Sequence, residues 1–228
     1  MSEWERVLET QQQLQHHFPE CVLVGGTAAA LHAGHRHSLD GDHVMQDLRL
    51  RFPEVLTRLE QLAGWRSRRI IPPVEILGNL EGVPTGIRQL RRTAPLQTQV
   101  IAGIRVPTLA EMLRVKGWLI VTRNATRDFL DFCALATKLG DGFVDALSSM
   151  DVLYPQETGE SVRRQLAQQL AEPKPRDLQG IDLRRYRGLQ PPWDEWSQVE
   201  SFCRQLGQRL FRSLLRLPAT RDGAGDAP

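Results

Sequence analysis

The chain has 228 residues, of which 41% are hydrophobic and 25% are charged, and its formal net charge is +2. This length suits one α/β domain with a hydrophobic core, or a core domain with a helical extension. No apolar run approaches the ~20 residues of a membrane-spanning helix, and the polar N-terminal segment MSEWERVLET has no signal-peptide core, so we expect a cytoplasmic protein without a membrane partner.

The pattern of apolar residues predicts both helices and strands. Helical spacing occurs over residues 3–17, 51–63, 108–123, 127–139, 159–171 and 194–216. Short apolar runs predict strands over residues 21–24, 70–71, 74–77 and 98–106, the last with an internal turn. Three scattered cysteines without CxxC spacing favour neither a disulfide framework nor a zinc site.

The first chemical signal is Gly25-Gly26-Thr27, which separates a predicted strand from an alanine-rich helix. Glycines let the backbone approach a phosphate closely, and a new helix offers free N–H groups at its positive end. A hydroxyl at Thr27 adds one more donor. The alternative is a simple strand-to-helix turn.

The second signal is the pair Asp40 and Asp42. In an extended chain, residues two apart point to the same side, and two carboxylates there repel each other unless a cation lies between them. Magnesium prefers such oxygen ligands together with substrate phosphates. The alternative is turn chemistry, because Asp-Gly also favours turns.

Two more signals lie downstream. Glu75 stands among apolar residues, either as a third carboxylate of a metal site or on a solvent-facing edge. Lys116 and Asp128 could hold a triphosphate and orient the substrates, or form a structural ion pair, as could Arg127 with Asp131.

In order and spacing, these features resemble the AbiEii-like (abortive-infection toxin type) nucleotidyltransferases, a branch of the DNA polymerase β-type nucleotidyltransferase superfamily. The resemblance covers roughly residues 20–137. Its most specific parts are the GGTA…R-x-S-x-D-x-D block over 25–42 and the K…R…RD-x-x-D block over 116–131.

The resemblance implies an α/β (α+β) fold: a mixed, twisted sheet flanked by helices and followed by a helical C-terminal portion. We expect a nucleotidyltransferase domain over 1–150, a basic helical extension over 151–216, and a disordered tail over 217–228. Residues 161–216 contain 11 Lys or Arg against 6 Asp or Glu, which fits either an RNA partner or a solvated helix face.

The resemblance also implies roles for individual residues. The phosphate-cradling turn is matched by Gly25, Gly26 and Thr27. The metal ligands are matched by Asp40 and Asp42, with Glu75 near the place of a third carboxylate. The residues just ahead of the aspartates are matched by Arg36 and Ser38, and the lysine and aspartate around the nucleotide by Lys116 and Asp128.

The implied activity is Mg²⁺- or Mn²⁺-dependent transfer of an NMP from an NTP to an acceptor hydroxyl, in a toxin with an antitoxin partner. The acceptor stays open between an RNA, with tRNA as the leading candidate, and a protein, including the chain itself at Ser38. Two departures from the family pattern, Gly41 between the aspartates and His43 after them, leave a non-catalytic binding protein as the alternative. His43 is either an extra metal ligand or a polar rim residue.

Overall fold

The computed structural model describes residues 1–216, so the tail expected over 217–228 lies outside the described residues. Five strands form one mixed sheet in the order β1-β2-β5-β4-β3. Strands β2 and β5 run parallel, whereas the other neighbours run antiparallel. The strands are β1 (Val22–Val24), β2 (Gly41–Met45), β3 (Trp65–Ile71), β4 (Glu75–Leu80) and β5 (Val83–Gln89).

One face of this sheet is covered by α1 (Glu3–His17) and α3 (Leu48–Glu60). Their apolar side chains form a hydrophobic cluster with residues of the sheet, including Leu14, Phe52, Ile76 and Ile87. Helix α1 has the bounds that the sequence predicts, and a capping box between Ser2 and Glu5 fixes its start. Helix α3 begins and ends three residues earlier than predicted.

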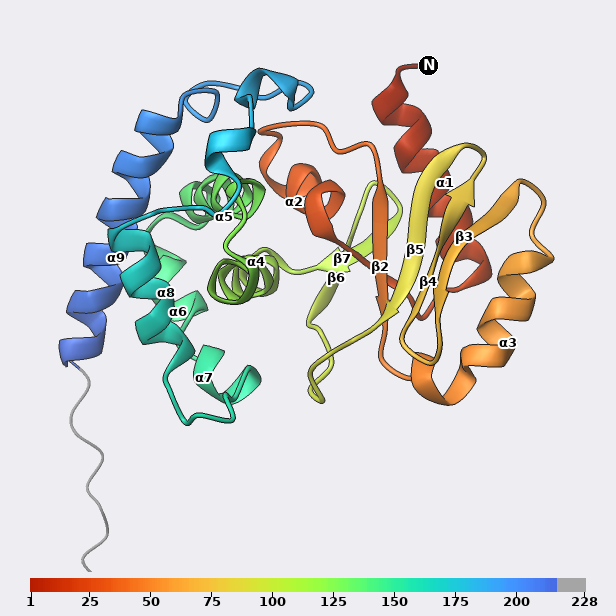
Figure 1. The fold of residues 1–228 in the computed structure, drawn as a ribbon, viewed down its shortest axis with the longest axis horizontal. Coiled ribbons are helices and arrows are strands. Elements are labelled where there is room, and N and C mark those ends of the chain that lie inside the picture. The colour runs from red at the N-terminus through yellow and green to blue at the C-terminus, as the bar shows by residue number, and fades with distance from the viewer. Residues whose placement is uncertain (217–228) are drawn as a thin grey trace, which may run out of the picture.

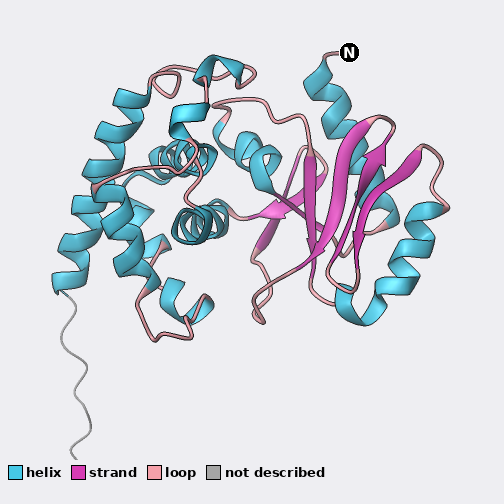
Figure 2. Cartoon of the chain, viewed as in Figure 1, coloured by secondary structure: helices cyan, strands magenta, loops and turns pink. Residues whose placement is uncertain are grey.

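The second half of the molecule is helical (Figures 1 and 2). Helix α2 (Gly25–Ala33) and the hairpin of β6 (Thr98–Ile101) and β7 (Ile104–Pro107) lie between the sheet and this half. The longer helices are α4 (Leu109–Arg123), α5 (Thr126–Leu139), α8 (Val162–Ala171) and α9 (Trp196–Arg216), and the short turns are α6 (Phe143–Ala146), α7 (Met150–Leu153) and the 3₁₀ segments Gly140–Gly142, Leu178–Gly180 and Leu183–Arg185.

A second hydrophobic cluster joins all of these helices to β1, with members from Leu23 to Leu210. Helix α9 packs closely on α8, since an added Cβ at Gly207 would lie only 2.8 Å from the Ala171 nitrogen. The predicted fold, a mixed, twisted sheet flanked by helices and followed by a helical C-terminal portion, is confirmed.

Three strands differ from the sequence prediction, and the first is β2, because no strand is predicted over Gly41–Met45. Strand β5 lies in the middle of the sheet although no strand is predicted over Val83–Gln89. Its Pro84 and Gly86 are turn-type residues that hide the strand pattern. Strand β3 begins at Trp65 rather than at Ile70, because its exposed arginines interrupt the apolar run.

Gly41 is held between the strands and helix α1. Its side of β2 faces Gln11, which is fully buried, and an added Cβ at Gly41 would lie 1.9 Å from the Gln11 Oε1 atom. The Thr85 hydroxyl lies 2.8 Å from the Gly41 carbonyl oxygen and 3.1 Å from Gln11 Oε1. Gly41 is therefore a packed strand residue and not a flexible link between the two aspartates.

We predict that Gly41→Ala lowers the free energy of unfolding by roughly 1–3 kcal/mol, because the new methyl group forces Gln11 out of its place. In a Gln11→Ala background the same substitution should cost much less, since the obstructing atoms are gone. Urea unfolding of the four chains measures both values. Equal costs in the two backgrounds would show that Gln11 is not the obstacle.

Candidate active site

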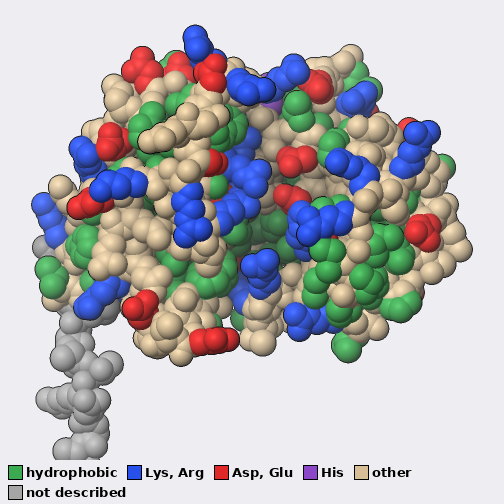
Figure 3. Space-filling model, in the orientation of Figure 1, with side chains coloured by type: hydrophobic (Ala, Val, Ile, Leu, Met, Phe, Trp, Pro, Cys, Tyr) green, Lys and Arg blue, Asp and Glu red, His purple; other side chains and the backbone are tan. Residues whose placement is uncertain are grey.

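A hollow of about 500 Å³ lies between the sheet and α4, and we call it the large hollow. Figure 3 shows Lys and Arg side chains gathered around a hollow between the two halves of the molecule. The basic residues of its wall are Arg36, Arg88, Arg91, Arg92, Lys116, Arg123 and Arg127. Its acidic residues are Asp40 and Asp42. The large hollow therefore combines a strongly positive wall with one pair of carboxylates.

The Gly25-Gly26 turn forms part of this wall. Gly25 has a φ of +74°, and an added Cβ there would lie 3.1 Å from the Asp42 Oδ2 atom. At Gly26 an added Cβ would lie 2.5 Å from Arg36 Nη2 and 2.6 Å from Ser38 Oγ. Both positions need glycine because the turn lies directly against these side chains. No side chain among the described residues caps the first N–H groups of α2, so these donors remain available to a ligand.

The structure brings Asp40 and Asp42 together at the large hollow. Asp40 directly precedes β2, and Asp42 pairs with Val24 on β1 and with Gly86 on β5. Ser38 Oγ donates a 2.7 Å hydrogen bond to Asp40 Oδ1. The buried Thr27 hydroxyl donates to the Asp40 carbonyl oxygen, so Thr27 fixes the backbone of the carboxylate pair from beneath the turn.

Glu75 lies two strands away from Asp42, with Arg88 between them. The Arg88 guanidinium contacts Asp42 Oδ1 through Nη1 and donates a 2.9 Å hydrogen bond to Glu75 Oε2 through Nε. Arg69 Nε lies 3.2 Å from the other Glu75 oxygen. Within residues 1–216 no three His, Cys, Asp or Glu side chains gather into a set that could hold a metal ion. Glu75, predicted as the third carboxylate, is thus held by arginines in this structure.

Arg88 is the main residue that the sequence prediction missed. Burial acts to lower its pKa, but the charges of Asp42 and Glu75 outweigh this effect and raise the pKa of Arg88 above its usual value. The guanidinium is therefore charged throughout the working pH range. No signal in the sequence marks it, because its strand is not recognisable from the apolar pattern.

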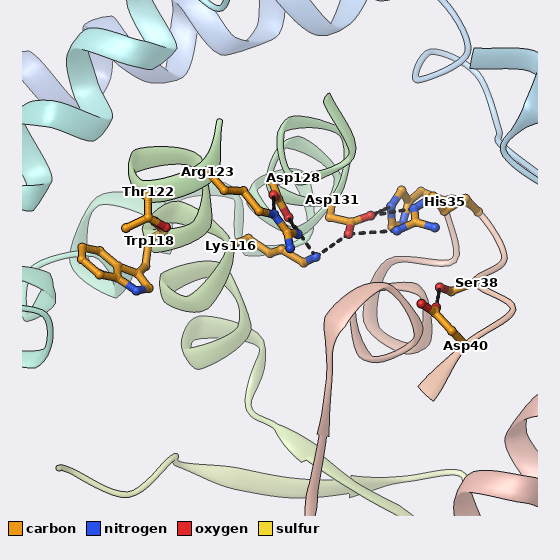
Figure 4. A network of polar contacts seen from close by, with 10 residues as sticks. His35, Ser38, Asp40, Lys116, Trp118, Thr122, Arg123, Asp128 and Asp131 are labelled. Carbon is orange, nitrogen blue, oxygen red and sulfur yellow. Dashed lines mark hydrogen bonds and ion pairs between the residues drawn. The ribbon is translucent and has the colours of Figure 1, made fainter. Parts of the chain in front are cut away.

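The back wall of the large hollow contains a buried ion cluster, shown in Figure 4. Asp131 is fully buried and receives Lys116 Nζ at 2.7 Å, Arg36 Nε at 2.8 Å and His35 Nε2 at 2.8 Å. Burial acts to raise the pKa of Asp131, but Arg36 and Lys116 hold it well below its usual value. The contacts join the loop after α2 to helices α4 and α5.

Asp128 is the second carboxylate of this cluster. It is fully buried, lies 3.3 Å from Lys116 Nζ and accepts a 2.6 Å hydrogen bond from Arg123 Nη2. Lys116 lines the large hollow, although only 1% of its side chain is exposed. The structural pair between Lys116 and Asp128 is therefore present, whereas Asp131 pairs with Lys116 and Arg36 in place of Arg127.

His43 borders the large hollow next to Asp42, but its side chain is fully buried. Successive side chains of a strand point to opposite faces, and His43 is fully buried while Asp42 is partly exposed. It shares its face with Gly41, which contacts α1. Burial lowers the pKa of His43 to about 4. The imidazole is thus a neutral core group, and the strand geometry separates it from the side of Asp42 that faces the large hollow.

The far end of the large hollow is apolar and aromatic. Trp118 and Tyr154 stack with ring centres 5.1 Å apart and an angle of 13° between the rings. Leu96 and Leu119 complete this end. Arg92 is fixed behind it by Glu111 at 2.7 Å.

A second hollow, of about 310 Å³, lies beside the first and we call it the small hollow. Arg68 and Arg69 of β3 form one side of it, and Pro84 and Thr85 of β5 contribute to another. Among residues 1–216, three side chains belong to both hollows, namely Asp40, Asp42 and Arg88. The carboxylate pair therefore stands between two spaces.

Comparison with known proteins identifies the fold of the chain. No protein-family model matches the chain. The crystal structure of JHP933 from Helicobacter pylori superposes with a TM-score of 0.58 at 15% identity, covering 93% of this chain and 92% of that one. A putative nucleotidyltransferase from H. pylori gives 0.57 at 16% identity, covering 96% and 100%. These similarities show that the chain has the nucleotidyltransferase fold.

One similarity in sequence is to a different kind of protein. The mycolic acid-containing lipids exporter MmpL11 of Mycolicibacterium smegmatis is 31% identical over 151 residues. This match covers 64% of the chain, but the chain spans only 15% of that exporter's length. Among residues 1–216, no helix has both the length and the apolar character needed to cross a membrane.

We predict that Asp131→Asn lowers the free energy of unfolding by roughly 3–5 kcal/mol, because it leaves Arg36 buried without its counter-charge and Lys116 with Asp128 alone. Asp141→Asn is the matched control, since Asp141 is fully exposed just after α5 and lies 3.7 Å from Arg209. Asp141→Asn should lower the free energy of unfolding by less than about 1 kcal/mol. Urea unfolding at neutral pH compares them, and similar losses would contradict the role of the cluster.

We also predict a pH dependence from His43. The unfolded chain binds a proton at His43 below a pKa of about 6.5, whereas the folded chain does so only near pH 4. Stability from this residue is therefore complete above pH 6.5 and falls by about 1.4 kcal/mol per pH unit towards pH 4. His43→Leu should flatten the curve in this range, while His17→Leu, at an exposed site, should not. If the free energy of unfolding changed with pH in the same way for wild type and His43→Leu, His43 would not be the source of the pH dependence.

Proposed function

We propose that this chain is a metal-dependent nucleotidyltransferase that moves an NMP from an NTP to an acceptor hydroxyl. The observation that carries the proposal is the large hollow, where the uncapped start of α2, the pair Asp40 and Asp42, and seven Lys or Arg side chains share one wall. The nucleotidyltransferase fold agrees with this assignment. Membership of the AbiEii-like family remains part of the proposal.

The positive wall suits the triphosphate. The free N–H groups at the start of α2, at Gly25 and Gly26, suit an anion. Arg36 and Arg123 add positive charge to the same wall. Lys116 lies behind this wall, where Asp128 and Asp131 hold its ammonium group in place. The aromatic end at Trp118 and Tyr154 offers an apolar surface for the base.

The residues present fit one divalent cation. Asp40 and Asp42 are adjacent, partly exposed carboxylates at the edge of the large hollow, which is the donor set that Mg²⁺ or Mn²⁺ takes together with phosphate oxygens. Such an ion would neutralise charge on the phosphates and polarise the α-phosphoryl group. Ser38 and Thr27 keep Asp40 in place for this purpose.

The reaction is a displacement at the α-phosphorus. The acceptor oxygen forms a bond to this phosphorus, and the bond from it to the oxygen that bridges to the β-phosphate breaks. Pyrophosphate leaves with the electron pair, and the acceptor hydroxyl gives its proton to solvent. Positioning and charge stabilisation by the chain supply the rate enhancement.

The acceptor that the surface favours is an RNA, with tRNA as the leading candidate. In an in-line reaction the attacking and leaving oxygens lie on opposite sides of the phosphorus. An acceptor for a nucleotide in the large hollow therefore enters through the small hollow, where Arg68 and Arg69 suit a phosphodiester. Because NTP and RNA are the proposed substrates, we propose a cytoplasmic location, and the resemblance adds a toxin role with an antitoxin partner.

Two alternative functions, self-modification and non-catalytic binding, have less support. Self-modification needs Ser38 as a nucleophile, but its side chain is buried and its hydroxyl is bound to Asp40. A non-catalytic binding protein was suggested by Gly41 and His43. Gly41 contacts Gln11 of α1, and His43 borders the large hollow only as a fully buried residue, so neither adds an exposed group beside the carboxylate pair.

We predict that Asp40→Ala reduces NMP transfer at least about 100-fold, because it removes one of the two carboxylates that position the cation. The assay incubates the protein with each α-labelled NTP, Mg²⁺ or Mn²⁺, and total cellular RNA. Asp47→Ala is the control, since Asp47 lies outside both hollows. Label on RNA that Asp40→Ala cannot produce supports the proposal, and label on protein redirects it to a protein acceptor. Undiminished transfer by Asp40→Ala would refute the site.

A further inference from the structure

Arg88 occupies a fixed place between the two groups predicted to bind metal. Strand β5 lies between β2 and β4, and Arg88 stands opposite Glu75 on β4 and Val44 on β2. Asp42 is two residues before Val44, so it shares the same face of the sheet and is the diagonal neighbour of Arg88. The register of three strands thus brings a cation between Asp42 and Glu75.

The contacts of Glu75 are with two arginines, although its Oε1 atom has no hydrogen-bond partner among the described residues. One of its oxygens accepts a 2.9 Å hydrogen bond from Arg88, and the other lies 3.2 Å from Arg69 Nε. Its side chain is 16% exposed and belongs to neither hollow. In contrast, Asp42 is 38% exposed and belongs to both.

Arg88 also stands at the meeting point of the two hollows. Of the residues that the structure describes, Asp40, Asp42 and Arg88 line both spaces, and a transfer reaction must occur where its two substrates touch. Two of these three groups are acidic and suit a cation. The third is a guanidinium, whose planar fork matches two phosphate oxygens and whose charge cannot be lost near neutral pH.

We propose that Arg88 is a catalytic residue that binds the transferred α-phosphoryl group and supplies the positive charge on the acceptor side of Asp42. Asp40 and Asp42 alone then hold a single divalent cation. Glu75 is a positioning residue that orients Arg88 and binds no metal. This inference rests on the proposed function and adds a guanidinium to the single metal ion of its mechanism.

The first test measures Mn²⁺ binding by electron paramagnetic resonance, with and without a non-hydrolysable NTP analogue. Asp42→Asn should weaken Mn²⁺ binding more than tenfold, as expected for a ligand. Glu75→Gln should change it less than threefold, and Arg88→Gln should tighten it severalfold, because the cation that competes for Asp42 is gone. A tenfold loss of Mn²⁺ affinity in Glu75→Gln, or a second Mn²⁺ site in the wild-type chain that Glu75→Gln removes, would overturn the inference.

The second test measures transfer to RNA. Arg88→Gln should lower kcat about 100-fold or more although it binds Mn²⁺ more tightly, and Arg88→Lys should recover part of the rate. A merely structural loss would not move the two readouts in opposite directions. Arg51→Gln is the matched control, because Arg51 also pairs with two carboxylates, Glu20 and Glu54, but belongs to neither hollow, and it should change neither readout more than threefold. Full transfer by a folded Arg88→Gln chain would overturn the inference.

The two proposals fail differently. A wild-type chain that binds neither Mn²⁺ nor the NTP analogue removes the proposed function and this inference with it. A wild-type chain that binds both, but loses Mn²⁺ affinity in Glu75→Gln, keeps the proposed function and loses only the role of Arg88. Thermal unfolding of each variant confirms that the comparison is between folded chains.

Discussion

The buried carboxylate of Asp131 is the contact on which the arrangement of the two halves depends. It receives His35 and Arg36 from the loop that leads to β2, and Lys116 from α4. A buried charge without partners is strongly destabilising, so these segments must stay together for the chain to fold. The same loop continues through Ser38 to Asp40, so this cluster contributes to the position of the carboxylate pair relative to the helical half.

The cluster also explains how a positive wall can be built in a partly buried place. Three cations, Arg36, Lys116 and Arg123, share two carboxylates, Asp128 and Asp131, which leaves an excess of one positive charge. The carboxylates make burial of the cations tolerable, and the remaining charge faces the large hollow. A triphosphate arriving there meets donors that are already oriented, so little reorganisation is needed.

The sequence predicts most elements whose apolar residues are periodic, such as the first helix and the helix that begins after Thr108. It also predicts Gly25, Gly26, Asp40 and Asp42 as one site, because their spacing is local. It misses β5, where Gly86 is required by the close approach of Leu77, whose Cδ2 would lie 2.5 Å from an added Cβ. Arg88 is missed with its strand. The buried cluster around Lys116 is missed because Asp131 also binds His35 and Arg36, which lie 96 and 95 residues away in the sequence.

Gly41 and His43 show why a departure from a family pattern can be misread when only neighbours in sequence are considered. Both face α1, where Gln11 fills the space that a side chain at position 41 would need. The geometry of the carboxylate pair is therefore set on the hidden face of β2, through Gln11 and Thr85, and not by the bulk of the residue between the aspartates. Positions 11 and 41 act as one packing unit, so a larger residue at 41 is compatible with the same site only when the residue at 11 is smaller.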